Sequence, residues 1–113
     1  MGFELIQRVY QQKRNERERL RLKILKKTFL ALEELSKEVS FKEAYLFGSI
    51  TKPYRFRPNS DVDLAFLELE KDKLFYTVAF LSNFLEREVD VVELERVSFK
   101  KKIFTEGIKW KKN

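Results

Sequence analysis

Cysteine and histidine are both absent from the 113 residues of this chain. Without cysteine there is no disulfide, no thiolate metal site and no cysteine nucleophile. Without histidine there is no Ser-His-Asp triad, no histidine-bound zinc and no imidazole for acid–base catalysis. Any catalysis must therefore use carboxylates, hydroxyls, lysine and arginine, which are groups suited to hard metal ions and to phosphate.

Long apolar runs are also missing, since no apolar stretch reaches ten residues. We therefore expect no membrane span, and because the N-terminus lacks an apolar signal core, a cytoplasmic location is the default expectation. Hydrophobic residues still make up 43% of the chain, with 11 Phe among them. This content predicts a packed core, and the length predicts one domain spanning residues 1–113.

Charge is unevenly distributed around the net value of +6. Residues 1–27 hold nine Lys or Arg against three Glu, residues 28–95 hold eight basic against fourteen acidic residues, and residues 96–113 hold seven basic against one acidic. Basic ends of this kind can attract nucleic acid or an acidic partner. The alternative is that charged helix faces only keep the protein in solution.

The hydrophobic pattern predicts an α+β fold with the element order α-β-β-α-β-α and a long N-terminal helix. That first helix is expected over residues 4–39, with a possible break near 12–16, where apolar residues are missing. Loop residues are expected at 50–60. The other predicted elements are strands at 44–47, 62–69 and 89–94, and helices at 72–87 and 98–107.

Helix ends and faces follow from particular side chains. Asp72 and Ser98 are predicted N-caps, and Gly107 is a predicted left-handed residue at a helix end. In the strand at 62–69, alternate residues from Val62 are expected on one face and those from Asp61 on the other. The expected core face of the helix at 72–87 consists of Leu74, Phe75, Val78, Leu81 and Leu85.

Aspartate is rare here, with four residues against fourteen Glu. Asp61 and Asp63 are two apart on a predicted strand, and Asp90 begins a neighbouring strand. Carboxylates at this spacing point the same way with Cβ atoms roughly 6–7 Å apart. That span suits two Mg²⁺ ions about 3.5–4 Å apart.

A candidate phosphate site lies upstream, where Gly48 and Ser49 end a predicted strand. Glycine allows close backbone approach, and the serine hydroxyl with adjacent amides can bind phosphate oxygens. The following loop supplies Lys52, Arg55 and Arg57 as cations.

Together these pieces, in LFGSITKPYRFRPNSDVDLAF and the later REVDVVEL, resemble the minimal nucleotidyltransferases of the DNA polymerase beta-like superfamily. The resemblance covers residues 44–107. It implies a catalytic core at 40–107 with residues 1–20 as a helical extension. It also implies the fold of that superfamily, a small mixed sheet backed by helices. The implied activity is transfer of a nucleotide to a hydroxyl, with AMP from ATP as the expected case.

The resemblance also implies the roles of individual residues. Two Mg²⁺ ions would be held by three catalytic carboxylates, with Asp90 completing the second site and helping to deprotonate the acceptor. The NTP-binding set would be Gly48, Ser49, Lys52, Arg57 and Ser60. The metal-binding and catalytic set would be Asp61, Asp63 and Asp90.

Two departures from the family pattern stand out. Eleven residues separate Ser49 from Asp61, one more than usual, and Pro53 replaces a glycine and removes an amide donor. In this family, proteins as short as this one are often antitoxins paired with a helical toxin of the HEPN type, and some transfer AMP to a toxin tyrosine. The alternatives are an inactive partner-binding module of the same fold, self-association through the N-terminal helix, or a basic nucleic-acid-binding protein. The last alternative is disfavoured because the basic segment 8–27 contains only Tyr10 as an aromatic for base stacking.

Overall fold

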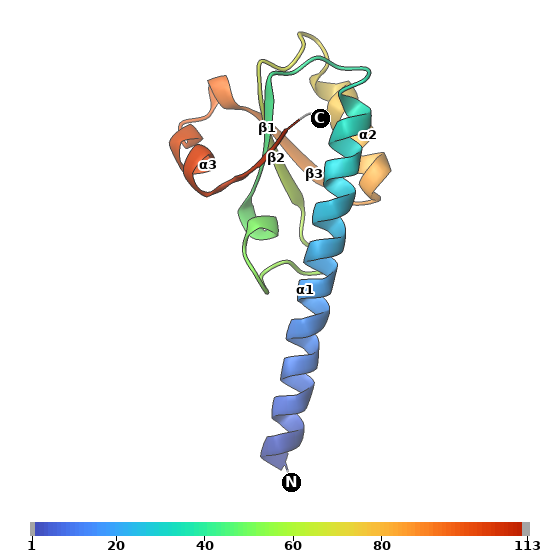
Figure 1. Ribbon diagram of the computed structural model, residues 1–113, viewed down its shortest axis with the longest axis vertical. Coiled ribbons are helices and arrows are strands. Elements are labelled where there is room, and N and C mark those ends of the chain that lie inside the picture. Colours follow the sequence, from blue (N-terminus) through green and yellow to red (C-terminus); the bar gives the residue numbers. More distant parts are fainter. Residues whose placement is uncertain (1, 112–113) are drawn as a thin grey trace.

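The computed structural model describes residues 2–111 and shows a four-stranded mixed sheet in the order β3-β2-β1-β4. Helices α1 and α2 cover one face of this sheet, and α3 lies against the other (Figure 1). The predicted α+β fold is therefore confirmed. The elements are α1 (Gly2–Leu35), β1 (Glu43–Phe47), η1 (Gly48–Thr51), β2 (Val62–Leu67), α2 (Leu74–Leu85), β3 (Val89–Glu93), η2 (Leu94–Arg96), α3 (Lys100–Glu106) and β4 (Ile108–Trp110).

The central strand pair places polar and apolar residues on opposite faces, as the sequence predicts. β2 pairs antiparallel with β1 and parallel with β3. Val62, Leu64 and Phe66 point into the main core beneath α1 and α2. Ala65 belongs to the smaller cluster that includes Ile103 of α3. The face that carries Asp63 is therefore the face covered by α3.

Helix α1 is longer and more regular than the sequence predicts at its N-terminal end. It runs unbroken for 34 residues, so the possible break near residues 12–16 does not occur, and it ends at Leu35 rather than at residue 39. Its buried residues begin only at Arg21. The preceding part extends beyond the sheet (Figure 1), and the molecule measures 60 Å along its longest axis.

Both predicted N-caps are wrong. Asp72 has a positive φ of 65°, and α2 begins two residues later with Lys73 at the N-cap and no side-chain cap. Ser98 is likewise displaced, because Phe99 is the N-cap of α3 and its side chain makes no capping bond. In both cases the chain enters the helix later than the capping pattern suggests, so the polar side chain lies outside the first turn.

Gly107 is required for a different reason from the one predicted. Its φ is −74°, so the left-handed conformation expected there is wrong. A Cβ at this position would instead lie 2.5 Å from the backbone oxygen of Ile103 and 3.0 Å from that of Leu46. The glycine thus lets α3 turn tightly into β4, a strand that the sequence pattern does not predict.

The core face of α2 also differs from the predicted one. Leu81 and Leu85 are buried as expected, but Phe75 is 90% exposed and Leu74 is also exposed. Thr77 takes the buried position in the first turn. Within residues 2–111, no helix has an apolar stretch long enough to cross a membrane.

Candidate functional site

Asp63 and Asp90 are direct neighbours in the sheet. Asp63 of β2 pairs with Asp90 of the parallel strand β3 on one side and with Phe47 of β1 on the other. Paired residues on adjacent strands project to the same face. Asp63 is half-buried between these neighbours, whereas Asp90 is exposed at its strand.

The electrostatics of Asp63 reflect this position. Its pKa is raised from the usual 3.8 to about 6, first by burial and then by the nearby charge of Asp90, a hydrogen-bonding contact with that carboxyl and the charge of Asp61. The ionised form of Asp63 is therefore disfavoured in the metal-free protein. A bound cation at this place would reverse that penalty.

The Gly48 turn lies directly against the Asp63 carboxyl. Gly48 has a φ of +77°, and a Cβ added there would be 2.3 Å from Oδ2 of Asp63. The turn is closed by the Thr51 hydroxyl, which donates to the Gly48 carbonyl at 2.7 Å. Glycine is needed at this point both for the left-handed backbone and for the close approach. The two halves of the motif, fifteen residues apart, therefore meet in space.

Arg87 holds the loop that leads to Asp61, and sequence reasoning missed it. Its Nη1 donates to the carbonyls of Ser60 at 2.6 Å and Arg57 at 3.4 Å, and its guanidinium lies 4.8 Å from the centroid of the Phe56 ring. Burial lowers the pKa of Arg87, and the negative charge of Asp61 opposes that effect. Nothing in the sequence marks this arginine, since its partners are carbonyls about thirty residues away.

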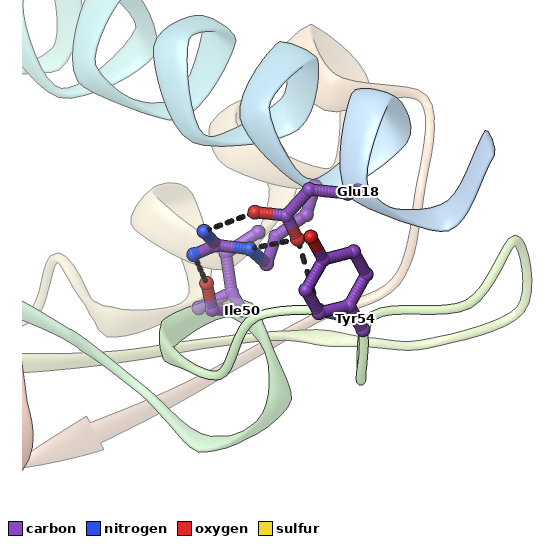
Figure 2. A network of polar contacts seen from close by, with 4 residues as sticks. Glu18, Ile50 and Tyr54 are labelled. Carbon is purple, nitrogen blue, oxygen red and sulfur yellow. Dashed lines mark hydrogen bonds and ion pairs between the residues drawn. The ribbon is translucent and has the colours of Figure 1, made fainter. Parts of the chain in front are cut away.

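A polar network joins α1 to the turn after β1 (Figure 2). The buried Arg21 guanidinium donates to both carboxylate oxygens of Glu18, at 2.9 and 2.7 Å, and to the Ile50 carbonyl at 3.0 Å. Glu18 also accepts the backbone N–H of Tyr54 at 2.9 Å. Its bond with Arg21 lowers the pKa of Glu18. The Glu18–Arg21 pair thereby ties the helix to both ends of the segment 50–54, with Arg21 bound to Ile50 and Glu18 bound to Tyr54.

Comparison with known proteins gives the family. Residues 31–111 match the family model described as "Polymerase beta, Nucleotidyltransferase". The chain belongs to this nucleotidyltransferase family. No curated protein matches the chain.

Two solved structures are similar to this member of the family. One is the crystal structure of a toxin-antitoxin with AMP-PNP, at 25% identity and a TM-score of 0.61, covering 75% of this chain and 73% of the other. The other is the toxin-antitoxin MntA-HepT, at 22% identity and a TM-score of 0.56, covering 77% and 71% of the two chains. The resemblance stated from the sequence is thus confirmed at the level of family and fold.

The remaining residues expected to bind NTP are distributed over two places. Ser49 is half-buried in the Gly48 turn, and the exposed Lys52 follows it. Both Gly48 and Lys52 line a hollow of about 250 Å³ that also includes Phe47 and Phe99. This hollow lies beside the strand position of Asp63 and is large enough for part of a small ligand.

Ser60 and Arg57 serve the loop instead. The Arg57 amide donates to the Ser60 hydroxyl at 2.9 Å, so this hydroxyl is already used within the turn. The Arg57 side chain is exposed and lies near arginines of α1, on a hollow that excludes Gly48. Their assignment to NTP binding stays a prediction.

The three carboxylates of Asp61, Asp63 and Asp90 are oxygen ligands of the kind that a hard cation such as Mg²⁺ prefers. Within residues 2–111, however, no three acidic side chains stand close enough together to form a ready metal site. Asp63 and Asp90 are paired neighbours in the sheet, and Asp61 acts on Asp63 through its charge. Sequence reasoning therefore found the carboxylates, and their roles as metal ligands remain predictions.

Proposed function

We propose that this chain is a Mg²⁺-dependent nucleotidyltransferase that moves AMP from ATP to a hydroxyl group. The observation that carries this proposal is the Asp63–Asp90 pair lying against the Gly48 turn. The family fold could form without that arrangement, but a half-buried carboxylate held beside a second carboxylate is unfavourable unless a cation is bound.

The three carboxylates Asp61, Asp63 and Asp90 would hold two Mg²⁺ ions, and when bound these ions neutralise charge on the phosphates and the acceptor oxygen. The amides and hydroxyl of Gly48 and Ser49 would bind the triphosphate, with Lys52 as a nearby cation. Arg57 and Ser60 would support this site from the loop. This assignment gives each predicted residue a chemical task.

The reaction itself needs only positioned groups. The acceptor oxygen attacks the α-phosphorus, a new P–O bond forms, the bond to the β-phosphate breaks and pyrophosphate leaves. The acceptor proton passes to Asp90, the most exposed of the three carboxylates and so the one a protein substrate can reach. Because no covalent enzyme intermediate is required, the absence of histidine and cysteine is no obstacle.

The acceptor we propose is a tyrosine of a HEPN-type toxin, with this chain as the antitoxin. Support comes from the similar solved structures, which are toxin–antitoxin proteins, one of them with the ATP analogue AMP-PNP. Association with such a helical partner would involve the projecting end of α1.

A second candidate is a partner-binding module of the same fold without activity. It is favoured by one observation, that the three carboxylates do not form a ready metal site within the described residues. Metal and nucleotide binding separates the two candidates, because an inactive module has no need of Mg²⁺ and ATP together.

The test combines binding with transfer. Mg²⁺-ATP should raise the melting temperature. At an ATP concentration about 100 times its dissociation constant, the free energy of unfolding should increase by about 2.7 kcal/mol. ATP with EDTA should stabilise the protein much less. Radioactivity from α-labelled ATP should then appear on a HEPN-type protein of the same genome but not on its tyrosine-to-phenylalanine variant. An unchanged melting temperature in the presence of Mg²⁺-ATP would rule out the NTP site.

A further inference from the structure

Four arginines from two distant parts of the chain surround one hollow of about 400 Å³. Arg14 and Arg17 come from α1, and Arg55 and Arg57 come from the loop between η1 and β2. Among residues 2–111 none of the four takes part in an ion pair. Four positive charges that repel one another around one concavity are a cost to the free protein, and a polyanionic ligand would remove it.

Two tyrosines complete the wall of this arginine hollow. Tyr54 is 39% exposed, and the Arg14 guanidinium lies 4.4 Å from the centroid of its ring. Tyr10 is 62% exposed and lies on the same hollow. The sequence offers only Tyr10 as an aromatic within the basic segment, whereas the fold brings Tyr54 to it from a distant loop. Aromatic faces among arginines provide stacking surfaces for bases beside charges for phosphates.

The hollow is firmly built. The Tyr54 backbone is held by the Glu18 carboxylate, which in turn is fixed by the buried Arg21 (Figure 2). Farther along the same loop, Arg57 is held through its carbonyl and amide in the turn with Ser60. The arginine side chains therefore project from helix α1 on one wall and from a held loop on the other, which lowers the entropic cost of binding.

We propose that the arginine hollow binds single-stranded nucleic acid. Arginine forks bind phosphate oxygens in pairs, and a phosphodiester backbone supplies one negative charge at every nucleotide. Stacking on Tyr10 and Tyr54 requires bases that are not paired, which favours a single strand over a duplex. An acidic protein segment would satisfy the arginines but would leave the tyrosine faces unused. The hollow includes none of the three aspartates and shares only Arg57 with the residues assigned to NTP binding.

The primary test is the binding of a short fluorescein-labelled oligouridylate, followed by anisotropy without Mg²⁺ or ATP between about 50 and about 200 mM salt. The pocket variant Arg14→Gln/Arg17→Gln should bind at least about tenfold more weakly, and the slope of log affinity against log salt should become shallower by about 1.4, since each phosphate contact contributes about 0.7. The loop variant Arg55→Gln/Arg57→Gln should show the same loss of affinity and the same change in salt slope. It replaces Arg14→Gln/Arg17→Gln in the test if that variant folds poorly.

The matched control is Arg8→Gln/Arg19→Gln, which removes the same charge from exposed positions of the same helix outside the hollow. It should lose much less affinity. Equal loss in the control would overturn the proposal, because the attraction would then be due to diffuse charge.

Tyr54→Ala separates nucleic acid from other polyanions. It should weaken oligouridylate binding about tenfold through lost stacking and leave binding of inorganic polyphosphate unchanged. An unchanged oligouridylate affinity in this variant, or competition by oligoglutamate as strong as that by unlabelled oligouridylate, would overturn the assignment to nucleic acid.

Discussion

Asp63 carries a conflict between the stability of the free protein and the proposed activity. Its ionised form is opposed by burial and by Asp90, yet binding of Mg²⁺ requires that form. Sites that perform chemistry commonly retain such unfavourable groups. At the scale of single residues, the fold is therefore expected to become more stable when this side chain loses its charge.

Asp63→Asn should abolish AMP transfer and raise the melting temperature of the metal-free protein at pH 7. Asparagine has nearly the same shape and no charge, so the repulsion with Asp90 disappears while the packing stays. The measurements are α-labelled ATP transfer and thermal unfolding in EDTA. Full transfer by this variant would show that Asp63 is not a metal ligand.

Gly48→Ala should destabilise the protein by about 1–2 kcal/mol, because a non-glycine residue pays that amount in the left-handed region. It should also abolish stabilisation by Mg²⁺-ATP, since the new methyl group displaces the Asp63 carboxyl. The control is Val39→Ala, which shortens a buried core residue that does not line the hollow beside Gly48. That variant should lose stability and keep its response to Mg²⁺-ATP in thermal unfolding. The same loss of response in both variants would contradict the specific role given to Gly48.

At the scale of elements, the sequence predicts the strands well because burial on a sheet leaves a clear alternation. The predicted strand at 62–69 lies at Val62–Leu67, with its apolar residues on the expected face. The neighbouring strands are also found within one residue at each end. The pairing of Asp63 with Asp90 could not be predicted from spacing alone, since it depends on the order and register of the strands.

The errors lie where local chemistry competes with tertiary contacts. Phe75 fits the helical spacing of the α2 core but is exposed, because α2 starts late and turns Thr77 inward. Strand β4 is only three residues long, and it exists through pairing with β1 rather than through its own pattern. The positions of Arg21 and Arg87 were not predictable either, since both donate to carbonyls that only the fold brings near.

Glu18→Gln should destabilise the protein by about 1–3 kcal/mol, because Arg21 would keep a buried charge without its carboxylate. The control is Glu16→Gln, an exposed acid two positions earlier on the same helix, which should change little. Denaturant unfolding measures both.

The same contact gives a pH dependence with a definite sign. Since Arg21 lowers the pKa of folded Glu18 below its usual 4.5, the stabilisation by Glu18 is complete at pH values above about 4.5 and is lost as the pH falls through the lowered pKa. The stability difference between the wild type and Glu18→Gln should therefore shrink in acid. A difference that grew in acid would contradict this role of the ion pair.

At the scale of the whole molecule, α1 serves two regions with different tasks. From Arg21 onward it covers the core, and between Arg14 and Glu18 it holds the loop that contains Tyr54. The apolar residues near its N-terminal end are exposed, and Figure 1 shows this end projecting away from the sheet. The exposed apolar residues there are Phe3, Leu5, Ile6, Val9 and Tyr10.

Deletion of residues 1–9 should leave the melting temperature and the stabilisation by Mg²⁺-ATP nearly unchanged, because every buried residue of α1 and the Arg14 contact with Tyr54 are retained. It should weaken association with a second copy or a HEPN-type partner, since a helix end that is 73% exposed at Phe3 and 67% at Ile6 gains stability only by burying that surface on another chain. Light scattering of the full-length and the deleted protein, alone and with partner, gives the masses of the complexes.

Ile6→Gln is the matched point variant, because it keeps the helix and its charge while removing part of the apolar face. Unfolding of the deleted protein would place the helix end in the core, and unchanged association in both variants would exclude it as the binding surface.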